Sequence, residues 1–324
     1  VTVYCQISGK GAVYEDEWHG IHRVNIPIEN EGALGTIFFD WKATLISARG
    51  QGTMLTLGYN TAIFGLAYRL LGKRNVINMD GIEYRRAKWG PIAKAWFYLN
   101  DWLGCWLGNH LVADHPEIMK HLETRVSSTK ISMIPYGADE VLQPDPGPLS
   151  ALGVEAGKYS TVIARPVPEN SILEIVSAFS RLQTEHKLVV LGDYARDNEY
   201  QRRVLETAGP GVIFPGAIFD TQIVSALRFY ARLYIHGHTV GGTNPSLIEA
   251  LAAKSAVLAH DNRFNRWVLG DAARFFSDVD GCESALRELL ADDPQISAMS
   301  AASAERHQQA FQWPAILAAY EAVL

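Results

Sequence analysis

The stretch LYIHGHTVGGTNPSLIEAL, residues 233–251, decides the fold of this sequence. Leu233 to His236 form a short apolar run that is typical of a buried strand, and a glycine-rich loop follows it. Asn244 is a favourable N-cap residue, and Pro245 is a favourable first residue of a helix. The order of strand, glycine loop and helix predicts one βα step of a parallel sheet.

The same loop and helix start predict an anion site. Gly241 and Gly242 permit positive φ angles and close approach of the backbone to a ligand. We expect the amides of Ser246 and Leu247, together with the helix dipole, to bind a diphosphate. Glu249 then lies within reach of ribose hydroxyls. A well-capped structural helix with a surface glutamate explains these residues as well.

Short apolar runs alternate with helical patterns along the chain, which is typical of βαβ units around a parallel sheet. The predicted strands are 1–5, 21–28, 53–58, 75–80, 110–115, 131–137, 160–165, 186–193, 211–216, 232–237 and 256–261. Helices are predicted near 33–49, 60–72, 91–108, 171–183, 197–207, 220–230, 244–254 and 263–269, and through 283–324.

Residues 138–158 break this rhythm with three prolines and three glycines, as expected of a linker between domains. We predict an N-terminal Rossmann-like domain over 1–140, a second over 141–305, and a C-terminal helix over 306–324 that packs back on the first. In open parallel sheets ligands bind outside the carboxyl ends of the strands, so two such domains facing each other would form a cleft for two substrates.

Composition excludes several classes of function. A net charge of −6 over 324 residues argues against a general nucleic-acid binder. The three cysteines are far apart, which argues against a zinc site or a disulfide framework and favours a reducing, cytoplasmic setting. The sequence contains neither the GxSxG motif of many hydrolases nor a phosphate-binding P-loop. A hydrolase or kinase function is therefore disfavoured.

Arg165 follows the first predicted strand of the second domain. At that place its guanidinium would face a bound ligand, and its paired donors match phosphate oxygens. A solvated surface arginine is the alternative.

NVINMDGIEYRRAKWG, residues 75–90, predicts a second polar site. Asp80 ends a strand and Gly81 permits a sharp turn, and several charged residues follow; we expect them to meet a polar acceptor or its phosphate. A solvated helix start with salt bridges is the alternative. The aromatic residues of 89–106 are typical of a core, although beside Arg and Lys they also suit a membrane surface.

Together these segments resemble glycosyltransferase family 4, and within it the bacterial rhamnosyltransferase-type branch. The resemblance rests on TLGYN (56–60), NMDGIEYRRAKWG (78–90), ADHPEI (113–118), IPYGAD (134–139), ARPVPENSI (164–172), GGTNPSLIEAL (241–251) and NRFNRWVLGDAARFF (262–276). It implies a GT-B fold of two facing Rossmann-like, doubly wound domains, and sugar transfer with retention from a nucleotide diphosphate sugar without metal or other cofactor. L-Rhamnose from a thymidine-diphosphate (dTDP) donor fits the branch. The implied acceptor is a saccharide or a lipid-linked oligosaccharide in surface polysaccharide synthesis, with the enzyme in the cytoplasm or at the inner face of the membrane.

The motifs and the resemblance together assign roles to individual residues according to their positions. Catalysis falls to Arg165, Asp80 and Glu83, and acceptor binding to Gly81, Arg85, Arg86 and Trp89. Donor binding falls to Asn170, Gly241, Gly242, Thr243, Asn244, Ser246, Leu247 and Glu249, with Phe214, Gly216 and Ile218 around the base.

Three positions depart from the family pattern. Gly241 replaces the first glutamate of its E-x7-E signature, Asn170 replaces a lysine, and Trp267 replaces a glutamate. The family also begins with a strand and a glycine-rich loop ahead of VTVYC, so we expect that segment to be missing here. A sugar-nucleotide epimerase and a non-catalytic nucleotide-sugar-binding subunit are the competing readings.

Overall fold

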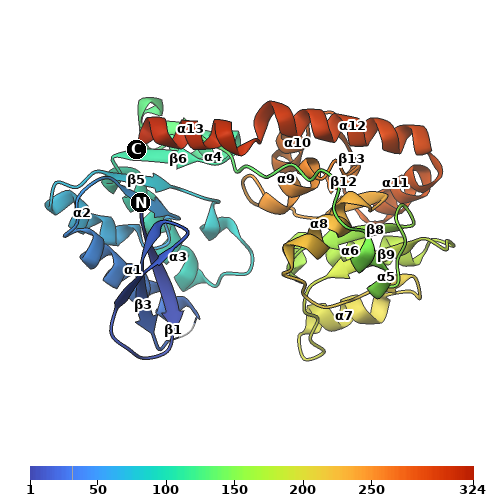
Figure 1. The fold of residues 1–324 in the computed structure, drawn as a ribbon, viewed down its shortest axis with the longest axis horizontal. Coiled ribbons are helices and arrows are strands. Elements are labelled where there is room, and N and C mark those ends of the chain that lie inside the picture. The colour runs from blue at the N-terminus through green and yellow to red at the C-terminus, as the bar shows by residue number, and fades with distance from the viewer. Residues whose placement is uncertain (31) are drawn as a thin grey trace. The chain divides into compact units, whose positions relative to one another are not determined.

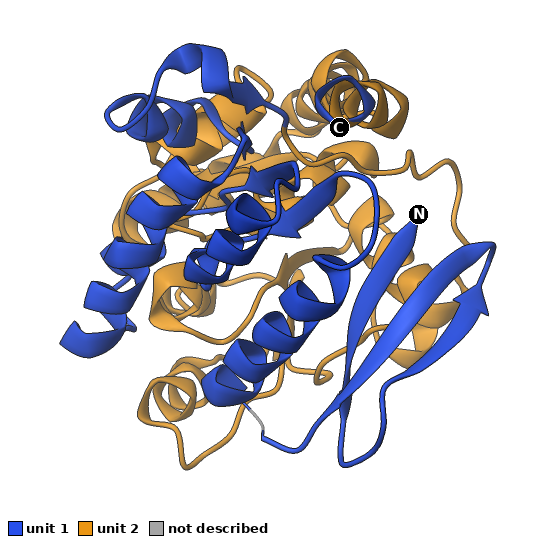
Figure 2. Ribbon diagram, turned by 90° about the vertical axis from the view of Figure 1, so that its left-hand side faces the viewer, with its two compact units in different colours: residues 1–134, 321–324 blue, residues 135–320 orange. Residues whose placement is uncertain are grey.

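The computed structural model describes residues 1–30 and 32–324. Contacts divide them into two compact units, which Figure 2 colours separately. Unit 1 comprises Val1–Ile134 with Glu321–Leu324, and unit 2 comprises Pro135–Tyr320. The finer limits of 1–140, 141–305 and 306–324 remain predictions.

Unit 2 is built on one parallel sheet of six strands (Figure 1). Its strands are β8 (Tyr159–Ile163), β9 (Lys187–Leu191), β10 (Val212–Ile213), β11 (Leu233–His236), β12 (Val257–His260) and β13 (Ala273–Phe276). Their order is β10-β9-β8-β11-β12-β13. The chain therefore builds outward in one direction from β8 and then returns to start β11 on its other side, which is the doubly wound topology.

Helices cover both faces of this sheet. They are α5 (Gly147–Ala151), α6 (Ile172–Ser180), α7 (Glu199–Thr207), α8 (Thr221–Phe229), α9 (Pro245–Ala252), α10 (Arg263–Leu269), α11 (Val279–Ala291) and α12 (Asp293–Ala310). The last helix, α13 (Trp313–Val323), begins in unit 2 and ends in unit 1. In β9, Leu188 and Val190 belong to one buried apolar cluster, whereas Val189 and Leu191 belong to another. Successive side chains of a strand point to opposite faces, so a strand buried on both reads as a continuous apolar run.

Unit 1 contains two sheets where the sequence pattern suggests one. The first has the order β1-β3-β2, and the second is the parallel sheet β4-β5-β6-β7. The strands are β1 (Thr2–Ser8), β2 (Tyr14–Trp18), β3 (Ile21–Ile28), β4 (Met54–Leu57), β5 (Asn75–Asn78), β6 (His110–Ala113) and β7 (Ile131–Met133). The helices are α1 (Gly32–Ser47), α2 (Gly65–Leu70), α3 (Pro91–Leu107) and α4 (Pro116–Glu123).

All eleven strands expected from the sequence are present, with ends shifted by a few residues. Two further strands, β2 and β13, were missed. Strand β2 pairs antiparallel with β3 across the two-residue turn His19–Gly20, whose φ angles are 49° and 77°. Positive φ angles at both central residues are typical of the two-residue turns that join antiparallel strands. The His-Gly pair in the sequence WHGI, residues 18–21, could have predicted this hairpin.

The last residues of the chain are bonded within unit 1. Thr53 Oγ1 donates to the carbonyl of Leu324 at 2.9 Å, and Arg74 Nη2 donates to that of Val323 at 2.9 Å. Over the described part of the chain, no helix combines the length and apolarity needed to cross a bilayer.

Candidate active site

The sheet of unit 2 places two of the predicted motifs side by side. Strands β8 and β11 are neighbours, although far apart in sequence, and strand order reverses between them. Arg165 follows β8, and the glycine loop 237–243 follows β11. In open parallel sheets this reversal opens a crevice outside the carboxyl ends of the strands, and ligands bind there.

The loops after β8 and β11 are packed against each other. A Cβ atom on Gly237 would lie 2.1 Å from the carbonyl oxygen of Asn170, so only glycine fits this contact. Thr239 donates twice to the carbonyl of Glu169, from its amide at 2.9 Å and from Oγ1 at 3.0 Å. The two loops thus form one continuous surface.

Arg165 is exposed on that surface. Its carbonyl accepts hydrogen bonds from Asn170 Nδ2 at 2.8 Å and from the Val167 amide at 2.8 Å, which fixes the backbone around it. Among the described residues its guanidinium has no carboxylate partner. Arg165 therefore has a fixed backbone and an exposed guanidinium that is available to a ligand. The side chain of Asn170, by contrast, is buried, and its Nδ2 donates to the Arg165 carbonyl.

Helix α9 begins as predicted, with Asn244 as N-cap and Pro245 as first residue. The amides of Ser246 and Leu247, which we expected to bind the diphosphate, both have protein acceptors here, so that role stays a prediction. The Ser246 amide donates to Asn244 Oδ1 at 3.0 Å, and that of Leu247 donates to the Asn244 carbonyl at 3.1 Å. The cap satisfies the same donors that an anion would need.

Two amides remain just before the cap. In the described chain the N–H groups of Gly241 and Gly242 donate to no protein acceptor. Gly241 has a φ of 138°, and nothing lies within 4 Å of the position of a Cβ atom. A glutamate in this backbone conformation would be strained, which is a physical reason for glycine at 241. Thr243, next in the loop, is buried.

Glu249 has a partner that sequence reasoning missed. Its Oε2 lies 2.5 Å from Nη2 of Arg228, a buried arginine on α8. The same nitrogen donates to Ser246 Oγ at 3.1 Å. Ser246 Oγ also lies 2.6 Å from the hydroxyl of Tyr234 and donates to the Ile163 carbonyl at 3.2 Å. Arg228 therefore ties Glu249 and the start of α9 to the end of β8.

Two stacked histidines lie where β11 passes into the loop. The rings of His236 and His238 are parallel within 9° at a centroid distance of 4.3 Å. Burial lowers the pKa of His236 well below its usual value, with the neighbouring His238 and His260 adding to the effect. At neutral pH His236 is therefore a neutral, buried ring at the end of β11, stacked on His238 at the start of the glycine loop.

The start of α10, which follows β12, holds the loop by hydrogen bonds. Asn262 Nδ2 and Asn265 Nδ2 both donate to the carbonyl of His238 at 2.9 Å. Both asparagines belong to the segment NRFN, residues 262–265. Their amide side chains are the sequence feature that could have predicted this contact. Trp267, where the family has a glutamate, packs edge-on against Phe311 at 6.0 Å, so its role in this fold is core packing.

The residues predicted around the base follow β10. Phe214 packs edge-on against Tyr194 at 4.9 Å, and Gly216 has a φ of 88°. The carbonyl of Gly216 accepts from the Gly192 amide at 3.1 Å, which joins the loops after β9 and β10. Ile218 is partly buried against a core cluster. All three lie at the carboxyl side of the sheet.

In unit 1, Asp80 and Glu83 differ sharply. Asp80 is exposed after the end of β5 and has a φ of 51°, a left-handed conformation that is uncommon for aspartate and that clusters at functional sites. Glu83 is buried, with Oε1 2.9 Å from Arg86 Nε and Oε2 accepting from Trp89 Nε1 at 2.9 Å. Both carboxylate oxygens of Glu83 therefore have protein partners. This agrees with the alternative interpretation of the segment 75–90, a helix start with salt bridges.

The other predicted acceptor residues surround this network. Gly81 is buried and forms the turn, whereas Arg85 is exposed with its guanidinium 6.0 Å from the Tyr84 ring. Asp278 and Asp280, two acidic residues separated by Val279, have structural roles: Asp278 caps α11, and Asp280 pairs with Arg181 at 2.8 Å. Over residues 1–30 and 32–324, no group of three or more His, Cys, Asp or Glu could hold a metal ion.

Comparison with known proteins agrees with this fold. Residues 153–306 match the family model described as Glycosyl transferases group 1. No curated protein sequence matches the chain. The sucrose-phosphate synthase of Thermosynechococcus elongatus is similar in structure, with a TM-score of 0.80 and 16% identity, over 99% of this chain and 87% of that one.

Two further solved structures are similar. Anabaena HepE in complex with UDP and glucose has a TM-score of 0.75 and 13% identity, over 94% of this chain and 87% of that one. An α,α-trehalose-phosphate synthase (UDP-forming) of Burkholderia vietnamiensis has a TM-score of 0.70 and 11% identity, over 95% and 90%. Residues 153–306 thus form a Glycosyl transferases group 1 domain, and the protein is a glycosyltransferase enzyme with the two-domain GT-B fold.

Proposed function

We propose that this protein is a retaining, metal-independent hexosyltransferase that moves a sugar from a nucleoside diphosphate to a saccharide or lipid-linked oligosaccharide acceptor. One observation carries the proposal. The guanidinium of Arg165 and the amides of Gly241 and Gly242 have no protein partner within residues 1–30 and 32–324, and they follow the two strands that flank the reversal of strand order. A diphosphate needs such donors, because negative charge develops on it as it leaves.

In the proposed reaction, an acceptor hydroxyl oxygen bonds to the anomeric carbon as the bond from that carbon to the diphosphate oxygen breaks. The acceptor proton passes to the departing phosphate, and attack on the same face retains configuration. Arg165 and the loop amides stabilise the leaving diphosphate, so the step requires no nucleophile from the protein. Glu249, held by Arg228, binds the ribose hydroxyls with its free carboxylate oxygen.

On the acceptor side we assign the contact to Asp80 and Arg85. Both are exposed, and neither has a partner of opposite charge in the described chain. Glu83, Arg86 and Trp89 bond to one another and support this loop. Asp80 is therefore a better candidate than Glu83 for contact with the reacting groups.

The resemblance to the rhamnosyltransferase-type branch supports dTDP-L-rhamnose as donor and a role in surface polysaccharide synthesis. The structural neighbours support a uridine nucleotide, since one is bound to UDP and glucose and another is UDP-forming. Gly241 leaves open space where the family carries a glutamate, which favours a sugar without that contact.

A donor panel tests the proposal. We would measure thermal shift and release of nucleoside diphosphate with dTDP-rhamnose, UDP-glucose, UDP-galactose and UDP-N-acetylglucosamine, with and without a lipid-linked saccharide acceptor. The correct donor stabilises the folded protein by mass action and so raises its melting temperature. At a hundredfold excess over Kd the free energy of unfolding rises by about 2.7 kcal/mol. We expect release that depends on the acceptor. Epimerised sugar without acceptor, or binding without turnover, would contradict transfer.

A further inference from the structure

Helix α3 has its polar residues inside and its apolar residues outside. Asn100 and Asp101 are 0% and 1% exposed, whereas Ile92, Leu99 and Trp106 are 88%, 48% and 56% exposed. These three lie seven residues apart, which places them on one stripe along the helix. An ordinary surface helix has the reverse arrangement.

The buried polar face of α3 is satisfied by the protein. Asn100 Oδ1 accepts from the Ile63 amide at 2.9 Å, and Asp101 forms an ion pair with Arg125 and lies 3.1 Å from His121 Nε2. The helix is therefore fixed in this orientation, and its outer stripe is a stable feature of the folded unit.

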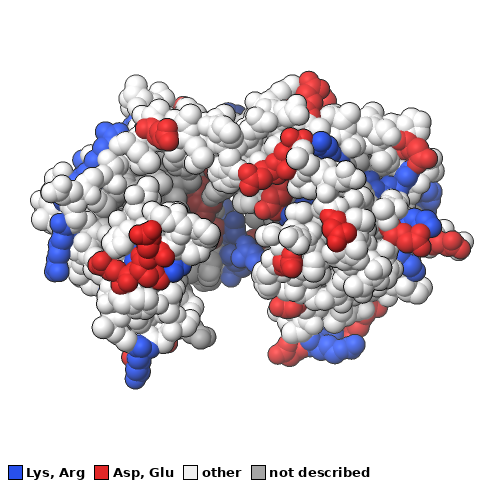
Figure 3. Space-filling view, viewed as in Figure 1, with Lys and Arg blue, Asp and Glu red and all other residues white. Residues whose placement is uncertain are grey.

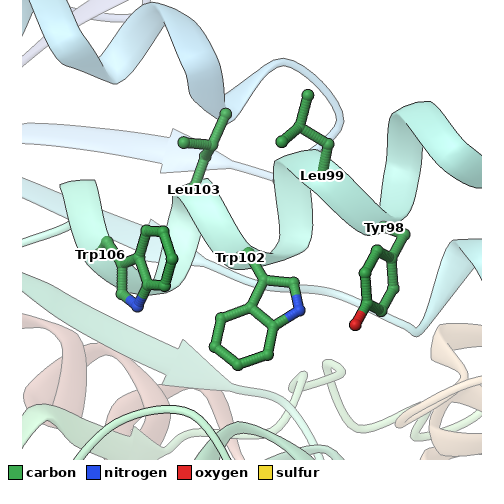
Figure 4. Close-up of a pocket in the computed structure, with 5 residues that line it drawn as sticks. All are labelled: Tyr98, Leu99, Trp102, Leu103 and Trp106. Carbon is green, nitrogen blue, oxygen red and sulfur yellow. The ribbon is translucent and has the colours of Figure 1, made fainter.

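The stripe contains an apolar pocket of ≈330 Å³ lined by Tyr98, Leu99, Trp102, Leu103 and Trp106. Figure 4 shows the three aromatic rings along one flank of α3 and the two leucines along the other. Helix α2, which contacts α3, adds exposed Leu66 and Leu70. Exposed apolar patches of this kind mark sites of interaction.

Cations lie near both ends of the stripe. Residues 32–108 contain nine lysines and arginines against four aspartates and glutamates, a net charge of +5 in a chain of net charge −6. Arg69 Nη2 donates to the Trp106 carbonyl at 3.1 Å, and Lys130 Nζ donates to the Cys105 carbonyl at 2.6 Å, so both cations lie at the end of α3. Lys94 lies near its start. In Figure 3 the far left-hand edge of unit 1, near α2 in Figure 1, carries Lys and Arg without acidic neighbours.

We infer that the outer stripe of α3, with the cations at its ends, docks on an anionic lipid bilayer. Trp and Tyr rings suit the boundary between headgroups and acyl chains, and Lys and Arg bind anionic headgroups. A second copy of this chain would bring the same positive charge to the contact and be repelled. This inference is independent of the donor and of turnover.

Co-sedimentation of the full chain with vesicles tests it, using equal parts phosphatidylglycerol and phosphatidylcholine against pure phosphatidylcholine. We expect binding to the anionic vesicles that falls with salt. The triple variant Ile92→Ser/Leu99→Ser/Trp106→Ser should lose at least about tenfold in partitioning. Arg69→Gln and Lys94→Gln should each lose about fivefold.

The matched control is Leu142→Ser/Phe219→Ser/Leu317→Ser, which removes three large exposed apolar side chains from unit 2. Its vesicle binding should equal that of the unaltered protein, and circular dichroism should show that both triple variants fold. Equal binding by the stripe variant and the unaltered protein would overturn the inference. So would absence of vesicle binding together with a dimer, seen by light scattering, that the stripe variant converts to monomer.

Discussion

At the scale of single residues, Arg165 differs from most cations of unit 2 because it pairs with no carboxylate among the described residues. Arg181, Arg266 and Arg274 are each paired with an acidic side chain. Arg165 instead has only its backbone fixed, through Asn170 and Val167. In an arginine that pairs with no carboxylate, the guanidinium donors stay free and the positive charge is not neutralised. The planar group can then form two parallel hydrogen bonds to a phosphate.

Replacing Arg165 with alanine should lower kcat by about 10²–10³, because charge on the leaving diphosphate then loses a preorganised donor. Arg165→Lys should recover only part of the rate. Turnover is followed by release of nucleoside diphosphate. Arg203→Ala, which removes an exposed arginine from α7, serves as the control and should leave the rate unchanged. An unaltered rate in Arg165→Ala would exclude this role.

The pair of Glu249 and Arg228 yields a prediction that separates structure from binding. Glu249→Gln should lower stability by about 2 kcal/mol, because the buried Arg228 loses its carboxylate. The double variant Arg228→Met/Glu249→Leu should regain much of that loss, since no unpaired charge remains. Stability is measured by urea unfolding.

Donor affinity should behave differently in the same variants. If Glu249 binds the ribose, the double variant remains weak in donor binding even when its stability has recovered. Recovery of both properties together would mean that Glu249 acts only through the fold. Isothermal titration with the nucleoside diphosphate distinguishes these outcomes.

At the scale of elements, the donor site depends on the distance between the loop after β8 and the loop after β11. The contact of Gly237 with the Asn170 carbonyl, and the two hydrogen bonds from Thr239 to Glu169, set that distance. Strands β8 and β11 are paired in the buried sheet. Their register therefore sets where the two loops begin.

Gly237→Ala should separate the two loops, because the added Cβ would lie 2.1 Å from a backbone oxygen that cannot rotate away. We expect donor affinity to fall by at least about tenfold, with a loss of stability of about 1–3 kcal/mol from the forced shift. Gly90→Ala is the matched control, since nothing lies within 4 Å of its Cβ position and its φ is −71°. Full donor affinity in Gly237→Ala would show that the contact is unimportant.

At the scale of the whole molecule, the parts of the candidate machinery are divided between the units. Donor-side residues belong to unit 2, whereas Asp80 and Arg85 belong to unit 1. Each unit has its own sheets, so each can respond separately to a ligand. The cations of 32–108 likewise belong to unit 1 alone.

Hydrogen exchange should therefore respond unevenly to a bound nucleoside diphosphate. We expect UDP or dTDP alone to protect the amides of 165–171 and 237–244 in unit 2, because binding energy stabilises the bound loops. Amides of 78–90 should become protected only when a saccharide acceptor is added. Protection of 78–90 by the nucleotide alone would contradict this division, and exchange of buried β9 amides provides the internal control.

Much of the fold could be predicted because its signals are local. The apolar runs identified eleven strands, and Asn244 with Pro245 located the start of α9. Strand β2 was missed because its sequence, YEDEW, is rich in charge and its strand character depends on pairing with β3. The split of unit 1 into two sheets likewise depends on pairing, which no single segment specifies.

The sequence by itself determined the α/β class, the βα step at 233–251 and the position of Arg165 after a strand, because side-chain periodicity and caps act within a few residues. Only the tertiary structure decided which groups remain available to a ligand. Asn244 occupies the amides of Ser246 and Leu247, Arg86 and Trp89 occupy Glu83, and Arg228 holds Glu249. Hydrogen-bonding capacity is finite, so a group's availability depends on every partner that the fold brings to it.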